Sequence, residues 1–408
     1  MPEPAVTISS SQLTEDRYSR FRLIHWWDQE KIAAARVLVV GAGALGNEIL
    51  KNLALLGFRN VLIVDLDNIE LSNLSRTVLY SDADIGKSKA AAAAGAFQRM
   101  APEARVHGID ANIISSVGLG VFLWADVVLG GLDNREARLW INRAAWKTKR
   151  PWVDGAIEGV NGVARVFLPG KPACYECTLG ETDWELLERR MSCNLLTRED
   201  VEGGKVATTP TTSSIIAGIQ VQEAVKQLHG MPTLAGKGFV FEGLHHTSYV
   251  VEYSENPDCQ SHYSVEEIVA LPERGSALRV QELWERACRD LGSRQVTLEF
   301  SRDVIQRLSC PTCDEVETLY MPLGRLRFAE GKCMKDGAMR RVETIHNYTG
   351  AEDYGDRTLD QLGLPAFDLF TARSDKREVG YLIEGDSAQV LGAAGQSLPK
   401  AFSTRSSS

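Results

Sequence analysis

The sequence predicts an α/β protein built on a doubly wound parallel sheet and followed by a smaller α+β domain. Residues 36–40 and 61–64 form short apolar runs, which are typical of buried parallel strands. Between them, apolar side chains from Ile49 to Leu56 recur at a helical spacing, and Gly57 follows as a stop signal. A strand, a helix and a second strand within about 30 residues form a βαβ unit. A parallel sheet is therefore expected to begin here.

The same alternation continues along the chain, which favours a doubly wound sheet. Further helices are predicted over 17–34, 87–100, 213–228 and 276–291, and further strands over 104–109, 126–130, 152–167, 238–242, 247–253, 296–300, 366–372 and 379–383. The predicted domains are a flexible N-terminus at 1–16, an adenylation domain at 17–262 with a crossover loop at 178–212, a C-terminal domain at 263–388 with a cysteine-bearing insertion at 305–345, and a disordered tail at 389–408.

Composition argues against several classes of protein. The net charge of −9 over 408 residues argues against a nucleic-acid binder, which normally carries a basic footprint. No basic segment followed by an apolar run opens the sequence, and no run of about 18 apolar residues occurs. We therefore expect neither a signal peptide nor a membrane span. Eight cysteines are too few for a disulfide scaffold in a chain of this length, so a cytoplasmic protein with reduced thiols is expected.

A glycine-rich loop follows the first predicted strand and opens the first helix. Gly41, Gly43 and Gly46 would let the backbone approach phosphates, and the helix N-terminus favours their negative charge. Asp65, at the end of the next strand, stands where a ribose-binding carboxylate belongs. These residues predict a Rossmann-like nucleotide site. By themselves they are also typical of nicotinamide and flavin enzymes.

Charged and amide side chains follow successive predicted strands. A dinucleotide site does not need so many of them. A site that splits ATP between its α- and β-phosphates needs cations for the triphosphate and a carboxylate for Mg²⁺. The set therefore favours ATP over a dinucleotide. Its members are Asp67, Asn73, Arg76, Lys89, Asp133, Asn134 and Arg138.

Five blocks of sequence resemble the ThiF-type adenylyltransferases and ubiquitin-activating enzymes over residues 17–262. They read VVGAGALGNEILKNLALLGFRNVLIVDLD, NIELSNLSRTVLY, DIGKSKA, GGLDNREARLWIN and VDGAIEGVNGVARVFLPGKPACYECTL. The resemblance is strongest to the catalytic subunits of eukaryotic enzymes that activate ubiquitin-like modifiers. It implies an enzyme that uses ATP and Mg²⁺ to adenylate the C-terminal carboxylate of a ubiquitin-like protein.

The resemblance also implies roles for individual residues. In relatives, an arginine of an N-terminal RYxR motif reaches the ATP, often from the partner subunit, so Arg20 is the candidate here and a homodimer is implied. Thr77 stands where relatives carry Gln. The remaining implied roles are phosphate contact for Gly41, Gly43, Gly46, Asn73, Arg76 and Lys89, ribose binding for Asp65, and Mg²⁺ coordination for Asp133.

Two sets of cysteines have spacings typical of zinc ligands. Cys174 and Cys177 form a knuckle that needs a second pair to make a tetrahedral site, and two pairs have the right spacing, Cys259 with His262 and Cys310 with Cys313. In the family that this sequence resembles, the second pair follows an Asn-Pro-x-Cys segment, which implies Cys259 and, in place of the usual cysteine, His262. Such a closed site would hold a structural Zn²⁺. Cys310, Cys313 and Cys333 are candidates for a second zinc site, with Asp336 or His346 as a fourth ligand.

Cys193 is the candidate for covalent catalysis. It lies 16 residues after Cys177, and Arg189, Arg190 and Arg198 around it would lower its pKa. In modifier-activating relatives the thioester-forming cysteine follows the zinc knuckle at a similar distance. The loop here is shorter than in eukaryotic relatives, which insert a sizeable domain after this cysteine.

The C-terminal segment around TLDQLGLPAFDLFTAR resembles the ubiquitin-fold domain of activating enzymes, which recruits the conjugating enzyme. A dimerisation or lid domain is an equal alternative. The compact layout resembles bacterial members encoded beside ubiquitin-like proteins and implicated in phage defence. Two other functions stay open: a sulfur-carrier adenylyltransferase for thiamine or molybdopterin synthesis, and a non-catalytic scaffold.

Overall fold

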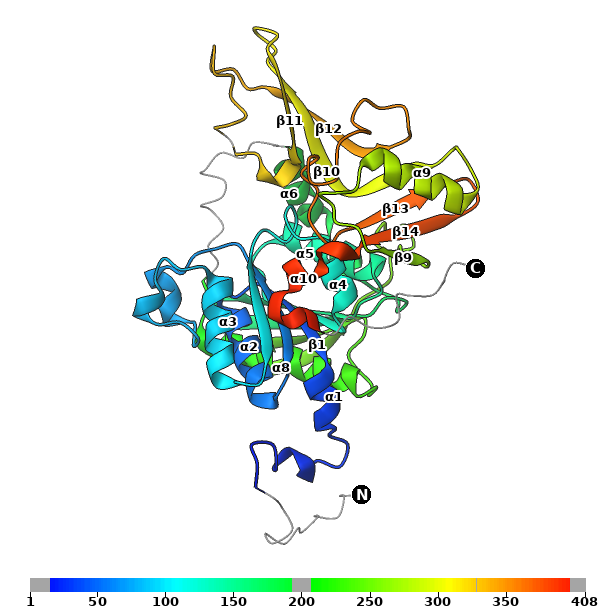
Figure 1. The fold of residues 1–408 in the computed structure, drawn as a ribbon. Helices are drawn as coiled ribbons and strands as arrows, with labels where there is room; N and C mark the ends of the chain where they lie inside the picture. The colour runs from blue at the N-terminus through cyan, green and yellow to red at the C-terminus, as the bar shows by residue number, and fades with distance from the viewer. Residues whose placement is uncertain (1–14, 193–206, 328, 397–408) are drawn as a thin grey trace.

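The computed structural model describes residues 15–192, 207–327 and 329–396, and it contains two sheets (Figure 1). The larger sheet has the strand order β3-β2-β1-β4-β5-β6-β7-β8. Strands β1 to β5 are parallel, because each of their pairings runs in the same direction, and β6 to β8 continue the sheet antiparallel. The strands are β1 (Arg36–Val40), β2 (Asn60–Asp65), β3 (Arg105–Asp110), β4 (Val127–Gly130), β5 (Trp152–Glu158), β6 (Asn161–Phe167), β7 (Lys237–Glu242) and β8 (Thr247–Glu252).

Helices cover both faces of this sheet, as the predicted doubly wound fold requires. One face packs against α2, α3 and α8 through a core that includes Ile49, Phe97 and Ile216. The other face packs against α4 and α5 through a core that includes Phe122 and Ile141. The helices are α1 (Gln29–Ala34), α2 (Ala44–Leu56), α3 (Lys89–Met100), α4 (Gly120–Trp124), α5 (Arg135–Lys147), α6 (Glu181–Ser192) and α8 (Pro210–Leu228).

The smaller sheet has the order β11-β10-β13-β14-β9, and β12 pairs with β10 beside it. Helix α9 packs on it through Leu283 and Trp284, which share a core with Phe370 and Tyr381. The predicted α+β character is confirmed; the ubiquitin-like fold stays a prediction. The elements are β9 (Ile268–Leu271), α9 (Val280–Leu291), β10 (Thr297–Ser309), β11 (Val316–Pro322), β12 (Arg341–Tyr348), β13 (Leu369–Arg373), β14 (Glu378–Ile383) and α10 (Ser387–Leu391).

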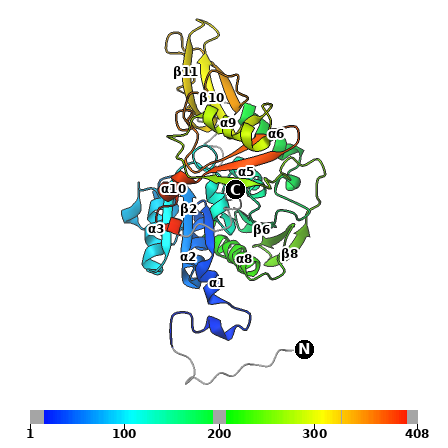
Figure 2. The ribbon, with the colours of Figure 1, turned by 45° about the vertical axis from the view of Figure 1, so that its right-hand side comes forward.

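The two sheets share a buried junction. Phe367, Leu369 and Leu382 belong to the same core as α4 and α5. Arg302 donates to the carbonyls of Ile114 and Val117 at 2.7 and 2.9 Å. These contacts join the smaller sheet to the segment before α4. Beyond the junction, β10, β11 and β12 project away from the larger sheet, at the end opposite α1 (Figure 2).

Several sequence predictions are wrong. The stretch 178–212, expected to be a loop, contains helix α6 and the start of α8. Residues 17–34 do not form one helix, because the chain makes only a short 3₁₀ turn at Phe21–Leu23 before α1. Residues 389–396, assigned to a disordered tail, complete α10 and a 3₁₀ helix at Gly392–Gln396. Burial of Leu391 and Ala394 in the core of the larger sheet explains this order. The long strands β10 to β12 were missed, apart from the first residues of β10.

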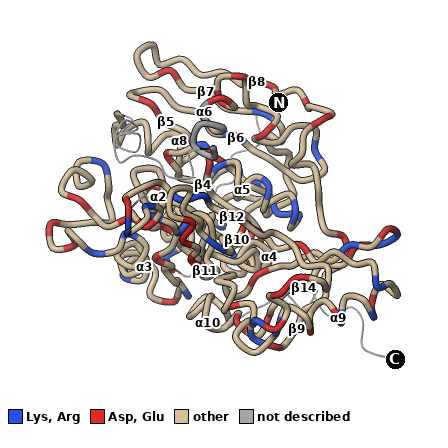
Figure 3. Tube along the Cα trace, turned by 90° about the horizontal axis from the view of Figure 1, so that it is seen from above, with Lys and Arg blue, Asp and Glu red and all other residues tan. Residues whose placement is uncertain are grey.

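Lys and Arg residues are interspersed with Asp and Glu along the described chain (Figure 3). Within that part of the chain, no helix has both the length and the apolar character that a membrane span requires.

Candidate functional site

A cleft of about 1560 Å³ opens at the carboxyl ends of the parallel strands. Strand β1 pairs with β2 on one side and β4 on the other, so the chain leaves it at a topological switch point, where open α/β sheets bind ligands. Most residues predicted to bind nucleotide line this cleft. They are Gly41, Gly43, Asp65, Asp67, Asn73, Arg76, Lys89, Asp133 and Asn134.

The glycine-rich loop uses its three glycines for different purposes. Gly41 has φ +93°, a left-handed conformation that favours glycine, and it packs against Gly131. A Cβ on Gly43 would meet no atom within 4 Å, so this position is open for an approaching ligand. A Cβ on Gly46 would lie 1.9 Å from the Gly41 carbonyl oxygen. Gly46 therefore packs the helix against the loop. Gly46 was predicted to contact the phosphates, but it is not among the residues that line the cleft.

Asp65 is held in place by the loop itself. Its carboxylate accepts hydrogen bonds from the backbone N–H groups of Ala42 at 2.6 Å and Asp67 at 2.8 Å. Burial raises the pKa of Asp65, while these two hydrogen bonds and the charge of Lys89 oppose the rise. The carboxylate is thus fixed at the wall of the cleft, where it could accept hydrogen bonds from ribose hydroxyls.

Lys89 is the cation nearest to Asp65 and Asp67. Its Nζ lies 2.8 Å from Asp67 Oδ2, and its side chain is only 12% exposed. Arg76 donates to the Ser72 carbonyl at 2.7 Å. Asn73 Oδ1 accepts from the Glu70 N–H at 2.9 Å, which caps a 3₁₀ helix. The structure therefore brings these three phosphate-binding candidates to one wall of the cleft.

Asp133 and Asn134 precede α5 on the opposite side of the glycine loop. Asn134 Oδ1 accepts from the Ala137 N–H at 2.7 Å and so caps α5. Asp133 is exposed at the cleft, where the side-chain amide of Asn134 lies 3.5 Å from its Oδ1. Its oxygens are therefore available as ligands for a hard cation, which fits the predicted Mg²⁺ role.

A buried charge cluster supports this side of the cleft. Asp154, on β5, is fully buried and accepts from Arg138 Nε and from Arg165 Nε, each at 3.0 Å. Arg138 also donates to the carbonyl of Gly155. Two guanidinium groups share one carboxylate, which leaves one net positive charge beside the cleft. Asp154 and Arg165 were missed by the sequence reasoning, although an aspartate inside an apolar strand was a usable signal.

Arg20 lies outside the cleft. It precedes the 3₁₀ helix Phe21–Leu23, and neighbouring Tyr18 packs against Gly57, the residue that ends α2. The glycine loop lies at the other end of α2, about 20 Å away for a helix of 13 residues. Within one chain, Arg20 and the cleft are therefore at opposite ends of this helix.

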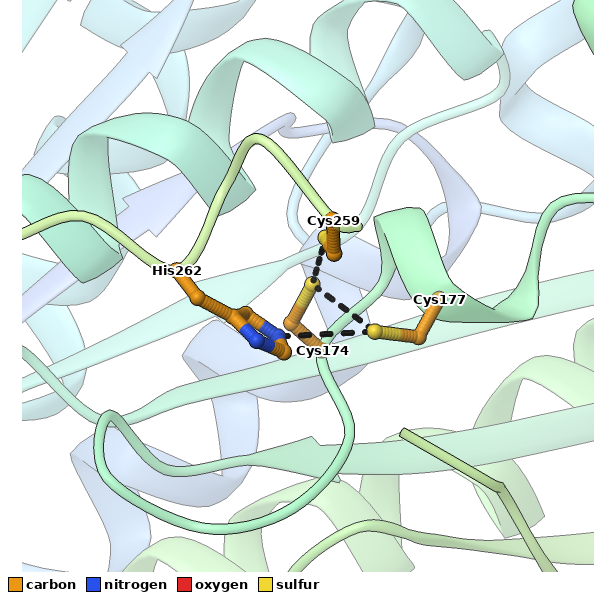
Figure 4. A group of neighbouring side chains, drawn as sticks. All are labelled: Cys174, Cys177, Cys259 and His262. Carbon is orange, nitrogen blue, oxygen red and sulfur yellow. Dashed lines mark hydrogen bonds between the residues drawn. The ribbon is translucent and has the colours of Figure 1, made fainter. Parts of the chain in front are cut away.

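Four predicted zinc ligands come together in a second site (Figure 4). Cys174 Sγ lies 3.7 Å from Cys177 Sγ and 3.5 Å from Cys259 Sγ, and Cys177 Sγ lies 3.4 Å from His262 Nε2. Ligands about 2.3 Å (sulfur) and 2.0 Å (nitrogen) from a tetrahedral zinc would be separated by roughly 3.5 to 3.8 Å. These spacings fit the ion without rearrangement.

Surrounding groups orient these ligands. His262 stacks on Trp146 with 4.3 Å between the ring centroids, and its Nδ1 lies 3.4 Å from Glu255. A carboxylate behind a ligating imidazole is the usual outer contact of a zinc site. Asn142 donates to Cys174 Sγ at 3.3 Å. Burial raises the pKa of Cys174 and Cys259, so a cation would be needed to hold them as thiolates.

The other cysteine candidates divide into two cases. Cys310, Cys313 and Cys333 gather with Asp336, so the fourth position of this cluster goes to Asp336 and not to His346. Cys193 lies outside the described residues. The described chain resumes at Ala207, whose carbonyl oxygen accepts a hydrogen bond from the Gly159 N–H. The next residue, Thr208, lines the cleft.

The ThiF family profile matches residues 15–261. The chain belongs to the ThiF family. It is 40% identical over 149 residues to the SUMO-activating enzyme subunit uba-2 of Caenorhabditis elegans, which covers 36% of this chain and 26% of that protein. It is 42% identical over 157 residues to the Nedd8-activating enzyme E1 catalytic subunit of Drosophila melanogaster, which covers 35% of each.

Solved structures support the fold of this ThiF family chain. MccB from E. coli, in a crystal structure with ATP, matches with a TM-score of 0.51 and 23% identity, over 61% of this chain and 75% of that one. A crystal structure of MccB with MccA gives a TM-score of 0.52 and 24% identity over 62% and 75%. The matches to the E1-like relatives span between 22% and 38% of their lengths.

Proposed function

We propose that this chain activates the C-terminal carboxylate of a ubiquitin-like protein by ATP-dependent adenylation in the cleft. The observation that carries the proposal is the joint placement of Asp65, Lys89 and Asp133 around an open glycine loop. Adenylation needs cations for the triphosphate and an exposed carboxylate for Mg²⁺, and a hydride-transfer site needs no such metal ligand beside its phosphates. Relatives named as SUMO- and NEDD8-activating enzymes lend support.

In the first step, an oxygen of the substrate carboxylate attacks the α-phosphorus of ATP. The bond between that phosphorus and the bridging oxygen breaks, and pyrophosphate leaves. Lys89 and Arg76 stabilise the negative charge that develops on the phosphates, while Asp65 fixes the ribose. Asp133 would hold Mg²⁺, which neutralises phosphate charge when bound. Arg20 would join from a second copy of the chain, because it lies at the far end of α2 in its own.

In the second step, the Cys193 thiolate attacks the acyl carbon, the bond to the phosphate oxygen breaks, and AMP leaves. The described flanks of the segment that carries Cys193 support this role. Asp183, on α6 before it, and Thr208 after it both line the cleft. The smaller sheet would then receive the conjugating enzyme. A role in bacterial defence against phage rests on the resemblance of the compact layout alone.

The zinc ion held by Cys174, Cys177, Cys259 and His262 would be structural. All four positions are protein ligands, which leaves none open for substrate. The site ties the segment after β6 to the segment after β8, and so braces the antiparallel edge of the sheet.

A two-part assay tests both steps. The protein is incubated with Mg²⁺, ATP and a ubiquitin-like protein that ends in glycine. Exchange of labelled pyrophosphate into ATP is measured first, and a thiol-sensitive adduct is sought second. We expect both, with Cys193→Ala losing the adduct while keeping the exchange. Cys288→Ala, in α9 and outside both metal clusters, is the matched control.

Each contrary outcome has a clear meaning. No exchange with any ubiquitin-like protein would remove the adenylation proposal. Exchange without an adduct would favour the sulfur-carrier adenylyltransferase. An adduct that survives Cys193→Ala would assign the thioester elsewhere. A phage-challenge assay in bacterial cells that express this chain together with a ubiquitin-like protein tests the defence role separately.

A further inference from the structure

We propose that Cys310, Cys313, Cys333 and Asp336 bind one zinc ion through two matching knuckles, which fold the outer part of the projecting β10–β12 arm. The first knuckle is the turn between β10 and β11, residues 310–315. The second is the turn at residues 333–338, before β12. The four ligand atoms lie within 4.8 Å of one another.

The two turns make the same backbone hydrogen bonds. The Cys310 N–H donates to the Glu315 carbonyl at 2.8 Å, and the Cys333 N–H donates to the Ala338 carbonyl at 2.8 Å. Each cysteine carbonyl also accepts from the N–H four residues on, that of Asp314 at 3.1 Å and of Gly337 at 2.9 Å. The turns are therefore equivalent position by position.

The sulfur contacts and the strained positions repeat as well. The Thr312 N–H points to Cys310 Sγ at 3.5 Å, and the Lys335 N–H points to Cys333 Sγ at 3.4 Å. The fifth residue of each turn is left-handed, with φ +56° at Asp314 and +72° at Gly337. N–H groups aimed at sulfur stabilise a thiolate, which is the form that binds metal.

This equivalence assigns the fourth ligand. In the first turn, the fourth residue is Cys313. In the second turn, the residue at the same position is Asp336. Its carboxylate oxygens lie 3.6 and 3.4 Å from Cys310 Sγ. Asp336 therefore stands where a fourth cysteine would complete the pair of knuckles, and a carboxylate oxygen is an established zinc ligand.

The distances fit a shared metal better than a disulfide. Cys313 Sγ and Cys333 Sγ are 3.6 Å apart, and a disulfide would require about 2.05 Å. Two sulfurs on a tetrahedral zinc would be roughly 3.8 Å apart, and a sulfur and a carboxylate oxygen roughly 3.5 Å. The two cysteines are also close in sequence, since Cys313 and Cys333 are 20 positions apart.

The outer arm has strand pairing and surface ion pairs, but almost no apolar core of its own. Of its residues between 310 and 340, only Tyr320 belongs to any of the three apolar cores found in the described chain. Met334 is 94% exposed, yet Cys310 and Cys333 are 1% and 3% exposed. In small units without an apolar core, a metal commonly supplies the folding free energy. Burying cysteines at an otherwise open tip fits that role.

The zinc would also secure a contact with the adenylation half. Strand β11 leads from the first knuckle to the 3₁₀ helix Leu323–Arg325. Arg325 Nε there donates to Ser116 Oγ at 3.0 Å, in the segment that follows the cleft residues Asn112 and Ile113. One knuckle precedes Arg325 in the sequence and the other follows it, so the zinc would hold both ends of the segment that makes this contact.

The test is a metal count on the 408-residue chain, by elemental mass spectrometry after gel filtration. We expect two zinc ions per chain in the wild type and one in both Cys313→Ser and Asp336→Ala. Cys288→Ser, at a cysteine outside both clusters, should keep two. Asp336→Cys should also keep two, and its second zinc should leave more slowly when a chelator is added, since zinc would then have four thiolates.

A second readout guards against variants that merely misfold. Backbone hydrogen exchange should rise in residues 310–340 of Asp336→Ala and stay unchanged in the glycine loop. Zinc in the wild type that Cys313→Ser does not lower would overturn the proposal. Iron in place of zinc would overturn it too, as would Cys313 and Cys333 that resist thiol reagents until reduced, which would signify a disulfide.

Discussion

The two halves of the chain each carry a four-ligand cysteine cluster, but they build it differently. In the adenylation half, the Cys174–Cys259 and Cys177–His262 contacts each join residues 85 positions apart. In the C-terminal half, the cluster is closed within 27 residues by two copies of one turn. The first cluster depends on the whole sheet being assembled, whereas the second can form locally. Loss of the first should therefore damage the fold far more.

Replacing a ligand in each cluster gives the largest expected effect. Cys174→Ser should lose one zinc and unfold the edge of the large sheet, since structural zinc can contribute about 10 kcal/mol or more, as much as a domain's whole stability. Thermal unfolding followed by tryptophan fluorescence reports on it, because Trp146 stacks on His262. Cys313→Ser should leave that transition in place. Equal shifts in the two variants would show that both clusters contribute equally to the stability of the large sheet.

The junction between the halves is tested by Arg302→Ala. Removing this guanidinium leaves the fully buried Asp368 without its ion-pair partner, which lies 3.6 Å away. It also leaves the carbonyls of Ile114 and Val117 without this hydrogen-bond donor. A loss of about 3–5 kcal/mol is expected in a urea titration. The control is Arg307→Ala, in an exposed pair with Glu343, which should cost less than about 1 kcal/mol. A small effect at Arg302 would mean that the other junction contacts, including the hydrogen bonds from the Leu119 N–H to Asp368 and from the Gly120 N–H to the Phe367 carbonyl, hold the halves without this ion pair.

The rate of adenylation should depend only on residues of the adenylation half. Lys89→Ala removes the nearly buried cation of the cleft, and pyrophosphate exchange should fall by about 10²–10³-fold. Lys87→Ala, two residues earlier and in an exposed pair with Asp84, should leave the exchange rate unchanged. Lys335→Ala, in the outer arm, should also leave the exchange rate unchanged. Loss of exchange in either control would contradict the separation of roles.

The smallest effect separates two glycines within one loop. Gly46→Ala places a Cβ 1.9 Å from the Gly41 carbonyl, so unfolding should become easier by about 1–3 kcal/mol. Gly43→Ala meets nothing within 4 Å and should fold normally, while nucleotide affinity falls because the methyl group occupies the open approach. Calorimetric titration with ATP, beside thermal unfolding of each variant, distinguishes the two outcomes.

The parallel sheet and the glycine loop could be predicted from the sequence, because apolar runs and the glycine spacing after a strand signal them locally. The cysteine spacing left two candidate pairs to join Cys174 and Cys177, and only the family resemblance pointed to Cys259 and His262, which the fold brings beside them. Asp65, Lys89 and Asp133 could also be predicted, since the ends of parallel strands meet at one edge. Residues that act through packing left weaker signals. In the sequence, Asp154 is a single carboxylate within an apolar strand, and only the fold places Arg138 and Arg165 beside it.

The tertiary structure settled the remaining assignments. It moved Gly46 from ligand binding to packing, because a helix and a loop meet there without room for a Cβ. It placed Arg20 at the end of α2 remote from the cleft. It ordered residues 389–396 by burying Leu391 and Ala394 against the sheet. It also chose Asp336 over His346, since hydrogen bonds between distant backbone groups repeat one turn geometry that spacing alone does not reveal.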